Sequence, residues 1–339
     1  MHKITLLGTT KKELENYIKE LNQEKYRVNQ IFNFIYKQKQ LDVEKFSSLP
    51  LRLREILKKQ TNPNCLKLVL KEVSNLDATT RYNFISLDNQ TIQAVYIPKY
   101  ERNVVCLSTQ IGCSVGCVFC ASGKNGFIRN LTANEIVEQF FWIEKDVKKI
   151  NGVLFMGMGE PLLNFENLVK SIEILTDQNA FGISRKKITV STVGILPNII
   201  KLKETGLGVK LAVSLHSYSD EIRKNLIKNL KYSVEEIIDA SIEYAKSTKT
   251  YLTIEYVIIK DLNDKEKDLQ GLIKLLNPIP RKLIKINLIP YNNTGSGHLS
   301  PILEQVEYFK KELIKNRFLT FIRKPHGQDI NSACGQLGF

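Results

Sequence analysis

The sequence predicts an α/β protein with a parallel sheet, in the form of a complete or incomplete α/β barrel that follows a small helical domain. From residue 104 onward, short runs rich in β-branched residues alternate with helical stretches, as strand–helix units of a parallel sheet do. Before residue 60, the apolar residues follow helical spacing instead. Of the 339 residues, 43% are apolar and 25% are charged, which is ordinary for a globular protein.

The N-terminal segment is predicted to form three short helices. Residues 11–21 carry apolar side chains at positions i, i+3, i+4 and i+7, and residues 28–36 repeat this pattern. A third helix is expected at residues 51–57, directly after a proline. Their polar faces are rich in Lys and Gln, so we expect a solvated, basic domain at residues 1–65.

Residues 66–98 change to an alternating apolar and polar pattern, which is typical of antiparallel strands, with turns at Asn75 and Asp88. We interpret this segment as a β-rich linker to a core at residues 99–327. The core has seven predicted strands and four predicted helices between them. The strands are residues 104–107, 153–156, 188–192, 209–215, 252–259, 283–288 and 318–322, and the helices are residues 133–147, 164–175, 234–245 and 302–315.

The net charge of +14, from 49 basic and 35 acidic side chains, predicts a polyanionic partner. The first 60 residues hold 13 Lys or Arg against 7 Asp or Glu. RNA or DNA is favoured over an anionic membrane, because no long amphipathic helix with bulky aromatic residues is present. No apolar run approaches the roughly 18 residues that span a bilayer, and the start is too poor in apolar residues for a signal peptide. We therefore expect a cytoplasmic protein.

Three cysteines, Cys113, Cys117 and Cys120, share one loop after the first core strand with the spacing C-x3-C-x2-C. A four-iron cluster usually takes four cysteines, so three thiolates leave one iron open to bind a second molecule. The alternative is half of a zinc site, which would need a second pair of ligands. The later candidates show no paired spacing; they are His216, His298, His326 and Cys334. We interpret the isolated Cys65 as a small core residue.

Further candidate site residues follow the predicted strands. The second core strand ends in Gly157-Met158-Gly159-Glu160, where glycines let a ligand approach the backbone and Glu160 offers a carboxylate to an ammonium group. Because active sites of α/β barrels lie where the strands end, polar residues at several strand ends should converge. These residues are Ser191, Thr192, Ser214, Leu215, His216, Tyr291 and Asn292.

The chain resembles the radical S-adenosylmethionine (radical SAM) superfamily, and within it the RNA adenine methyltransferases of the RlmN and Cfr type. The resemblance covers nearly the whole chain. The Pro161-Leu162-Leu163-Asn164 ending and the Gly126-Phe127 pair favour RlmN over Cfr. The segments that carry it are Cys106-x6-Cys113-x3-Cys117-x2-Cys120, Gly126-Phe127-x-Arg129-Asn130-Leu131, the run from Gly157 to Asn164, and Ala333-Cys334-Gly335-Gln336-Leu337.

This resemblance implies an incomplete (β/α) barrel that binds one 4Fe–4S cluster through the three clustered cysteines and uses two S-adenosylmethionine molecules per turnover. Cys334, in a C-terminal tail at residues 328–339, would be methylated and carry the methyl group to the substrate. Cys106 would then attack the Cys334 sulfur and release the product as a disulfide forms. The S-adenosylmethionine pocket would be lined by Gly159, Glu160, Ser191, Ser214, Leu215, His216 and Asn292.

The resemblance also implies the substrate, carbon 2 of an adenine in 23S rRNA and in tRNA anticodon loops. That carbon is electron-poor and has no usable lone pair, so a radical route through the cofactor avoids an unfavourable polar transfer. The N-terminal domain would bind RNA, and flavodoxin or ferredoxin would supply electrons. Two alternatives stay open, a carbon-8 methyltransferase of the Cfr type and a non-catalytic iron–sulfur protein that binds RNA.

One position departs from the family pattern. The family usually has a glutamate shortly before the Tyr-Ile-Pro strand, where it is thought to help remove a proton, and this chain has Gln93. Glutamine cannot act as a base. Either another group or water takes the proton, or turnover is slow, or this copy has relaxed its substrate requirements. We therefore assign no base role to Gln93.

Overall fold

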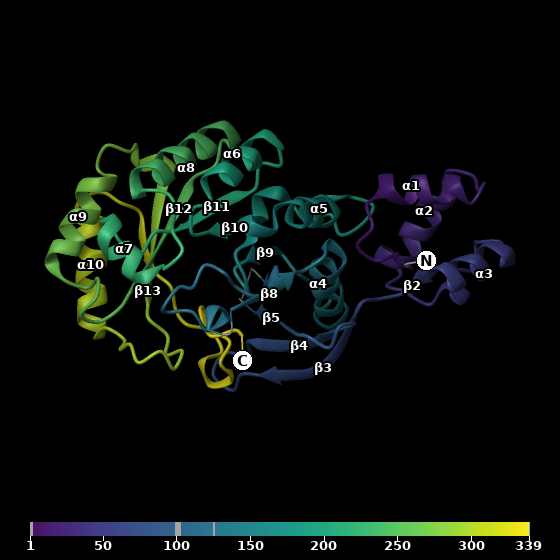
Figure 1. The fold of residues 1–339 in the computed structure, drawn as a ribbon, viewed down its shortest axis with the longest axis horizontal. Coiled ribbons are helices and arrows are strands. Elements are labelled where there is room, and N and C mark those ends of the chain that lie inside the picture. The colour runs from purple at the N-terminus through teal and green to yellow at the C-terminus, as the bar shows by residue number, and fades with distance from the viewer. Residues whose placement is uncertain (1–2, 99–102, 125, 339) are drawn as a thin grey trace.

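The computed structural model describes residues 3–98, 103–124 and 126–338, and within them one ten-stranded sheet forms the centre of the molecule (Figure 1). Its strand order is β14-β13-β12-β11-β10-β9-β6-β5-β4-β3. The strands are β3 (Leu66–Val73), β4 (Thr80–Ser86), β5 (Thr91–Ile97), β6 (Val104–Cys106), β9 (Gly152–Phe155), β10 (Ile188–Thr192), β11 (Lys210–Ser214), β12 (Leu252–Ile258), β13 (Ile284–Pro290) and β14 (Thr320–Ile322).

From β6 to β14 every neighbouring pair of strands is parallel, and the first and last strands of the sheet do not pair with each other. The prediction of an incomplete barrel is therefore confirmed, since the sheet stays open rather than closing on itself. All seven predicted core strands form, with ends that differ by two residues or fewer. Fully buried β-branched side chains, such as Val153, Ile188 and Ile254, explain why their positions could be predicted.

The antiparallel strands β3, β4 and β5 extend this same sheet, because β5 pairs with β6 and aligns Val95 with Cys106. The predicted turns at Asn75 and Asp88 lie at the two hairpins of this extension. Cys65 is buried just before β3, where its thiol lies 3.0 Å from a carboxylate oxygen of Glu138. These strands therefore continue the hydrogen bonding of the core sheet.

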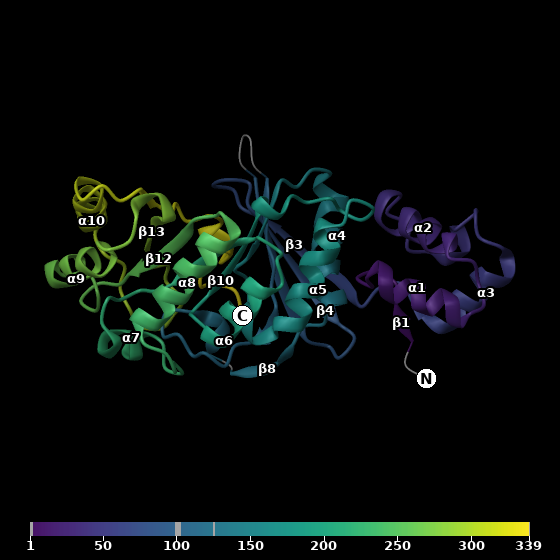
Figure 2. The same ribbon diagram turned by 90° about the horizontal axis from the view of Figure 1, so that it is seen from above.

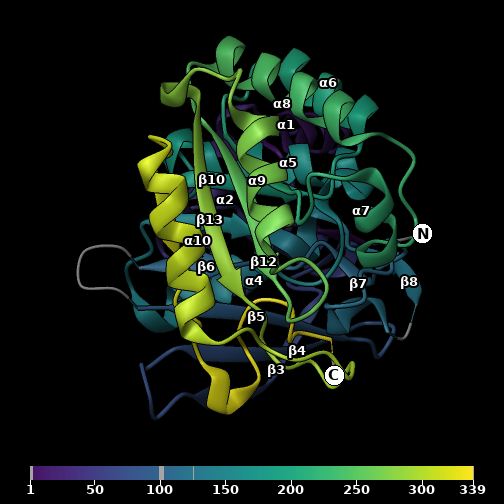
Figure 3. The same ribbon diagram turned by 90° about the vertical axis from the view of Figure 1, so that its left-hand side faces the viewer.

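Helices cover the outer face of the sheet (Figure 3). The four predicted core helices are present as α4 (Ala133–Val147), α5 (Phe165–Thr176), α8 (Val234–Thr248) and α10 (Leu303–Lys315). The chain also forms α6 (Leu196–Glu204), α7 (Asp220–Leu226) and α9 (Glu266–Leu276), which the sequence analysis did not predict. Helices α4 and α8 begin with capping boxes, Thr132 with Glu135 and Ser233 with Glu236, which satisfy the first free amides.

The three predicted N-terminal helices are present as α1 (Lys11–Glu20), α2 (Tyr26–Phe32), extended by a π-helical turn, and α3 (Leu51–Gln60). They surround their own apolar core at one end of the molecule, beside α4 and α5 (Figure 2). Phe141 of α4 and Ile174 of α5 belong to that core, so the helices pack directly against the core domain. None of the described helices has the length and apolar character that a bilayer-spanning helix needs.

The domain limits after residues 65, 98 and 327 stay predictions. The predicted start of the core at residue 99 lies outside the described residues, as do residues 1–2 and 339 of the first and last segments.

A two-stranded unit, β1 (Ile4–Thr5) with β2 (Thr61–Asn62), joins the two ends of the helical module. A second unit, β7 (Gln110–Gly112) with β8 (Phe127–Asn130), brackets the loop that holds the three clustered cysteines.

The helical module should depend on α3, which buries Leu57 completely and leaves Leu51 64% exposed. Replacing Leu57 by Ala should lower the free energy of unfolding by about 2–5 kcal/mol, because the substitution leaves a cavity. The matched Leu51→Ala change should alter it by less than about 0.5 kcal/mol. Urea unfolding followed by circular dichroism measures both, and equal effects of the two substitutions would contradict the packing described.

Candidate active site

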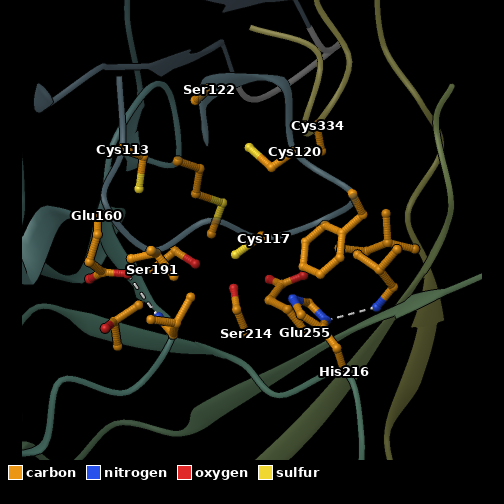
Figure 4. Close-up of a pocket in the computed structure, with 18 of the residues that line it drawn as sticks. Cys113, Cys117, Cys120, Ser122, Glu160, Ser191, Ser214, His216, Glu255 and Cys334 are labelled. Atoms are coloured by element: carbon orange, nitrogen blue, oxygen red, sulfur yellow. Dashed lines mark hydrogen bonds between the residues drawn. The ribbon is translucent and has the colours of Figure 1, made fainter. Parts of the chain in front are cut away.

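A cavity opens where β9 to β13 end, and the loop of the three cysteines forms its opposite side (Figure 4). We call it the cluster cavity. The sulfur atoms of Cys113, Cys117 and Cys120 point into a common space there. It brings together ten of the residues predicted from the sequence, which are Cys113, Cys117, Cys120, Gly159, Glu160, Ser191, Ser214, His216, Asn292 and Cys334.

The cysteine loop is held from three sides. The β7–β8 pair closes its base, and Cys117 forms an isolated antiparallel bridge with Ile227, just after α7. On the third side, the Ala121 amide donates to the Gly335 carbonyl at 2.7 Å. Three separate elements of the fold therefore determine the position of the loop.

The three clustered thiols are costly to ionise in the absence of a cation. Burial raises the pKa of Cys113 to about 12, that of Cys117 well above 9, and that of Cys120 above its usual value. Neighbouring thiols add to the rise at Cys113 and Cys117. A cationic iron–sulfur cluster would remove this cost, because thiolates are its ligands.

Within the described residues, no three His, Cys, Asp or Glu side chains lie close enough to hold one metal ion. A cubane binds each thiolate to a different iron, so its ligands stand farther apart than those of a single ion. Within the described part of the chain, the three clustered cysteines therefore do not form a site for a single metal ion.

Gly157 and Gly159 are required for local packing, in addition to the close ligand approach expected from the sequence. A Cβ atom on Gly157 would lie 2.8 Å from the carbonyl carbon of Leu107. On Gly159, which has φ +93°, it would lie 2.4 Å from the Gln110 Cβ. Both glycines line the cavity, but they are required because the chain after β6 packs tightly against them.

Glu160 is buried and its two carboxylate oxygens accept backbone amides. The Leu162 amide donates to Oε1 at 3.0 Å and the Val193 amide donates to Oε2 at 2.9 Å. Burial raises the pKa of this carboxyl to about 7. Each oxygen keeps a second acceptor position, so the carboxylate joins two strand ends and still has capacity to bind an amine.

His216 has left-handed backbone geometry, with φ +60°, and its ring is buried against the edge of Phe119 at 4.7 Å between ring centroids. Its Nδ1 accepts the Val257 amide at 3.0 Å. Burial, with a smaller effect from the charge of Arg223, lowers its pKa to about 3. The ring is therefore neutral near pH 7 and carries its proton on Nε2, as a hydrogen-bond donor.

Two predicted site residues do not line the cluster cavity. The Leu215 side chain is fully buried in the main apolar core, and only its backbone, whose carbonyl accepts the Arg223 Nε at 2.8 Å, lies near the site. Cys106 lines a neighbouring cavity of about 670 Å³, which we call the tail cavity. It lies between β5, β6 and the C-terminal segment; its lining includes Val95, Ile97, Cys106, Phe321, Arg323, Lys324, His326, Cys334 and Leu337.

Cys334 lines both cavities, so the tail does return to the site. The Asn292 side-chain amide donates to its carbonyl at 3.0 Å. Cys106 and Cys334 are both free thiols here, and burial, followed by the neighbouring Cys334, raises the pKa of Cys106 to about 12.

Sequence reasoning missed three charged residues of the site. Arg323 donates from Nη1 to the Cys334 sulfur at 3.4 Å and from Nη2 to Glu255 Oε1 at 3.2 Å. Arg223 is fully buried and donates to the carbonyls of the strand end at Ser214. For Glu255, in the middle of β12, and Arg323, directly after β14, the signal in the sequence is a charge within or next to an apolar strand. Arg223 lies in helix α7 and has no such signal.

Two buried polar atoms of this site have no hydrogen-bond partner within the described residues, Nη1 of Arg223 and Oε2 of Glu255. Buried polar groups normally have partners, so such atoms are candidates for contacts with a bound ligand. Of the two residues, Glu255 lines the cluster cavity, so its Oε2 is an acceptor available there, whereas Arg223 does not line that cavity. The residues present fit a polar ligand next to a cluster.

Comparisons with known proteins agree with this fold. The family profile "Radical SAM superfamily" matches residues 107–273, which contain the cysteine loop and the strands up to β12. A crystal structure of a radical SAM methyltransferase from Sphaerobacter thermophilus superposes with a TM-score of 0.93 at 34% identity, over 98% of each chain. The fold and the cysteine loop thus define a radical SAM protein.

The profile "Ribosomal RNA large subunit methyltransferase N-terminal domain" matches residues 4–62. A probable dual-specificity RNA methyltransferase RlmN from Endomicrobium trichonymphae is 40% identical over 100% of this chain and 98% of its own length. The relative from Thermosipho melanesiensis is 43% identical over 98% of this chain and 97% of its own length. The relative from Francisella tularensis subsp. novicida is 36% identical over 99% of this chain and 92% of its own length. The chain belongs to the RlmN family. The cofactors of radical SAM proteins are a 4Fe–4S cluster and S-adenosylmethionine.

The packing around Gly159 leads to a test. Gly159→Ala should destabilise the protein by about 2–5 kcal/mol, because a left-handed alanine and a clash with Gln110 add together. Displacement of the cysteine loop should also lower the iron content after anaerobic reconstitution. The control is Gly206→Ala, at φ +64° with open space around its Cβ, which should cost only about 1–2 kcal/mol and leave the iron content unchanged. Equal iron contents in the two variants would contradict the role of this packing.

Burial of the neutral His216 should make stability depend on pH. Between about pH 6.5 and pH 3 the unfolded chain binds a proton at this residue that the folded chain does not. Above pH 6.5 the buried ring therefore does not lower the free energy of unfolding. Below pH 6.5 the free energy of unfolding falls as the pH drops, by up to about 1.4 kcal/mol per pH unit. Urea unfolding of the apoprotein at several pH values should show a shallower slope for His216→Gln than for the parent. Parallel slopes would count against a buried neutral imidazole.

Proposed function

We propose that this protein methylates carbon 2 of an adenine in RNA, with Cys334 as methyl carrier and Cys106 as resolving thiol. The observation that carries the proposal is the position of Cys334, which lines both the cluster cavity and the tail cavity. A sulfur in that position can receive a methyl group from the first cavity and present it to a substrate in the second.

The choice of RNA follows from the relatives. Several are named dual-specificity RNA methyltransferases, and the N-terminal profile is named for the large ribosomal subunit. We therefore propose adenines of 23S rRNA and of tRNA as substrates, read as exposed bases. The basic helical module at residues 1–65 would bind RNA, since the first 60 residues hold 13 Lys or Arg against 7 Asp or Glu.

The chain's own residues have distinct parts in this scheme. The three clustered cysteines would hold the cluster, and Glu160, Ser191, Ser214, His216 and Asn292 would bind S-adenosylmethionine with the backbone of Gly159 and Leu215. When bound, these cofactors supply the one-electron chemistry that an electron-poor ring carbon requires. Arg323 orients the carrier sulfur, since its guanidinium donates to that sulfur at 3.4 Å.

Cys106 would act last. After the methyl carbon has bonded to adenine, the Cys106 thiolate would bond to the Cys334 sulfur while the bond from that sulfur to the carbon breaks. The electron pair of the broken bond would stay on the carbon, which takes up a proton and becomes the methyl group of the product. Because its thiol has a pKa raised to about 12, Cys106 must lose a proton before it attacks, so it stays unreactive until the site is assembled.

We further propose flavodoxin or ferredoxin as the electron donor and a cytoplasmic location.

The test is an anaerobic reaction of purified, reconstituted protein with rRNA and tRNA fragments and S-adenosylmethionine that carries a fully deuterated methyl group. The product should be 2-methyladenosine that has lost one of the three deuterium atoms, because the carrier methyl must give up one hydrogen. Mass spectrometry of digested RNA measures this. A product methylated at carbon 8, or one that keeps all three deuterium atoms, would contradict the proposal.

The cysteine roles are tested separately. Cys334→Ala should abolish methylation of RNA, and Cys106→Ala should leave RNA covalently attached to the protein. The control is Cys65→Ala, at a buried cysteine that lies outside both cavities, which should form product at the rate of the parent. Unchanged RNA modification in Cys334→Ala would instead support a non-catalytic RNA-binding protein.

A further inference from the structure

Replacing the hydrogen of a ring carbon with a methyl group requires that carbon to lose a proton, so the proposed function needs a base near the substrate. Gln93 cannot be that base. Its side-chain amide donates to Asn83 Oδ1 at 2.9 Å, and its side-chain carbonyl accepts the Gly338 amide at 2.9 Å. It fastens the tail and does not line the tail cavity.

An apolar cluster stands between Gln93 and the tail cavity. Val95, Met158 and Leu337 pack together. Met158 lines a third cavity, which Gln93 also lines, whereas Val95 and Leu337 line the tail cavity. A side chain that takes the proton must therefore be one of the other residues that line the tail cavity.

The titratable groups that line the tail cavity within the described residues leave one candidate. Arg323 and Lys324 are cations without a free lone pair at neutral pH, so neither can accept a proton. Cys106 and Cys334 are assigned to the transfer itself, and Cys120 to the cluster. The remaining titratable side chain is His326.

His326 is held by the carboxylate of Asp77, which does not itself line the tail cavity. Its Nδ1 lies 2.8 Å from Oδ2 of Asp77, in the turn between β3 and β4. The Thr79 amide donates to the other oxygen of Asp77 at 3.1 Å. Burial acts to raise the pKa of Asp77, but hydrogen bonds from His326, Thr79 and Ser74 outweigh it and lower the pKa to about 2.

An ionised carboxylate only accepts hydrogen bonds, so Nδ1 of His326 must donate to Asp77. The neutral ring then carries its lone pair on Nε2. A carboxylate that fixes the tautomer of a histidine in this way also stabilises the imidazolium that forms when Nε2 takes a proton.

The same turn fixes the segment that carries His326. The Ser74 hydroxyl and the Asn75 amide donate to the carboxylate of Asp329, at 2.6 and 2.9 Å. Arg81 of β4 donates to the Asn331 carbonyl at 3.2 Å. The histidine and the carrier cysteine thus belong to one segment that β3 and β4 hold against the cavity.

We propose that His326, oriented by Asp77, is the general base that takes the proton from the methylated adenine carbon. This inference rests on the proposed function. After the carrier carbon has bonded to the ring, the proton moves to Nε2 while the electron pair of the broken C–H bond stays in the ring. The step needs no oxidant or reductant, and the imidazolium formed is paired with the Asp77 carboxylate.

The experiment is a single anaerobic turnover with the reconstituted full chain and an rRNA fragment. His326→Gln cannot accept the proton, so the covalent adduct between Cys334 and RNA should accumulate on a denaturing gel. Product release should fall by about 10²–10⁴-fold, the usual contribution of a general base. Affinity for the same RNA, measured without cofactors, should stay within about twofold, since a base makes little contribution to ground-state binding.

Two further variants sharpen the result. His298→Gln makes the same substitution at a histidine outside both cavities and should match the parent throughout. His326→Ala should also accumulate the adduct, and added imidazole should release product from it, because a free base can occupy the vacated space. Rescue by imidazole keeps the test decisive even if His326→Gln is poorly folded.

Several outcomes would overturn the inference. Product release by His326→Gln at the rate of the parent would show that His326 is not the base. Weak RNA binding with no adduct would assign it a role in holding RNA instead. Accumulation of the adduct in Glu255→Gln alone would assign the base to that carboxylate of the cluster cavity. If the parent itself neither methylates Cys334 nor modifies RNA, the proposed function fails as well, and this result is distinct from the other three.

Discussion

The proposed chemistry depends on the position of one sulfur atom, that of Cys334. This residue borders the cluster cavity and the tail cavity at once, although it belongs to a segment with little regular structure. Hydrogen bonds hold that segment, from the Ala121 amide to the Gly335 carbonyl, from Asn292 to the Cys334 carbonyl, and from Arg323 to the sulfur itself. Directional bonds define one position more sharply than apolar contacts do, which suits a group that must face two ligands.

Two features of the fold position this segment, the open edge of the sheet and the antiparallel strands β3 to β5. Because the sheet stays open, the space on its inner side is available to the cysteine loop and the tail rather than to a closed layer of side chains. The antiparallel strands β3 to β5 then extend the sheet beneath the tail and present the turn that binds it. The segment interpreted from the sequence as a linker is therefore a structural part of the site.

Local patterns explain what the sequence could predict. Strand β10 and helix α4 were located to the residue, because a β-branched run and a capping box are local signals. The spacing of the three cysteines likewise indicated a common ligand. The Asp77–His326 pair could not be found in this way, because its residues lie 249 positions apart and meet only through the sheet extension. Leu215 was predicted as a site residue because it follows a strand, but its side chain is buried in the core. A position at a strand end does not determine whether the side chain faces the cavity or the core.

The order of the strands bears on how the protein is made. Each strand of the ten-stranded sheet lies beside the strand of that sheet that precedes it in the chain, so the sheet can grow at one edge as the polypeptide leaves the ribosome. The cysteine loop lies between β6 and β9 and is complete early, whereas the segment with Cys334 follows β14 and is synthesised after all of them. During synthesis the nascent chain therefore exposes the three clustered thiols before the tail can cover them.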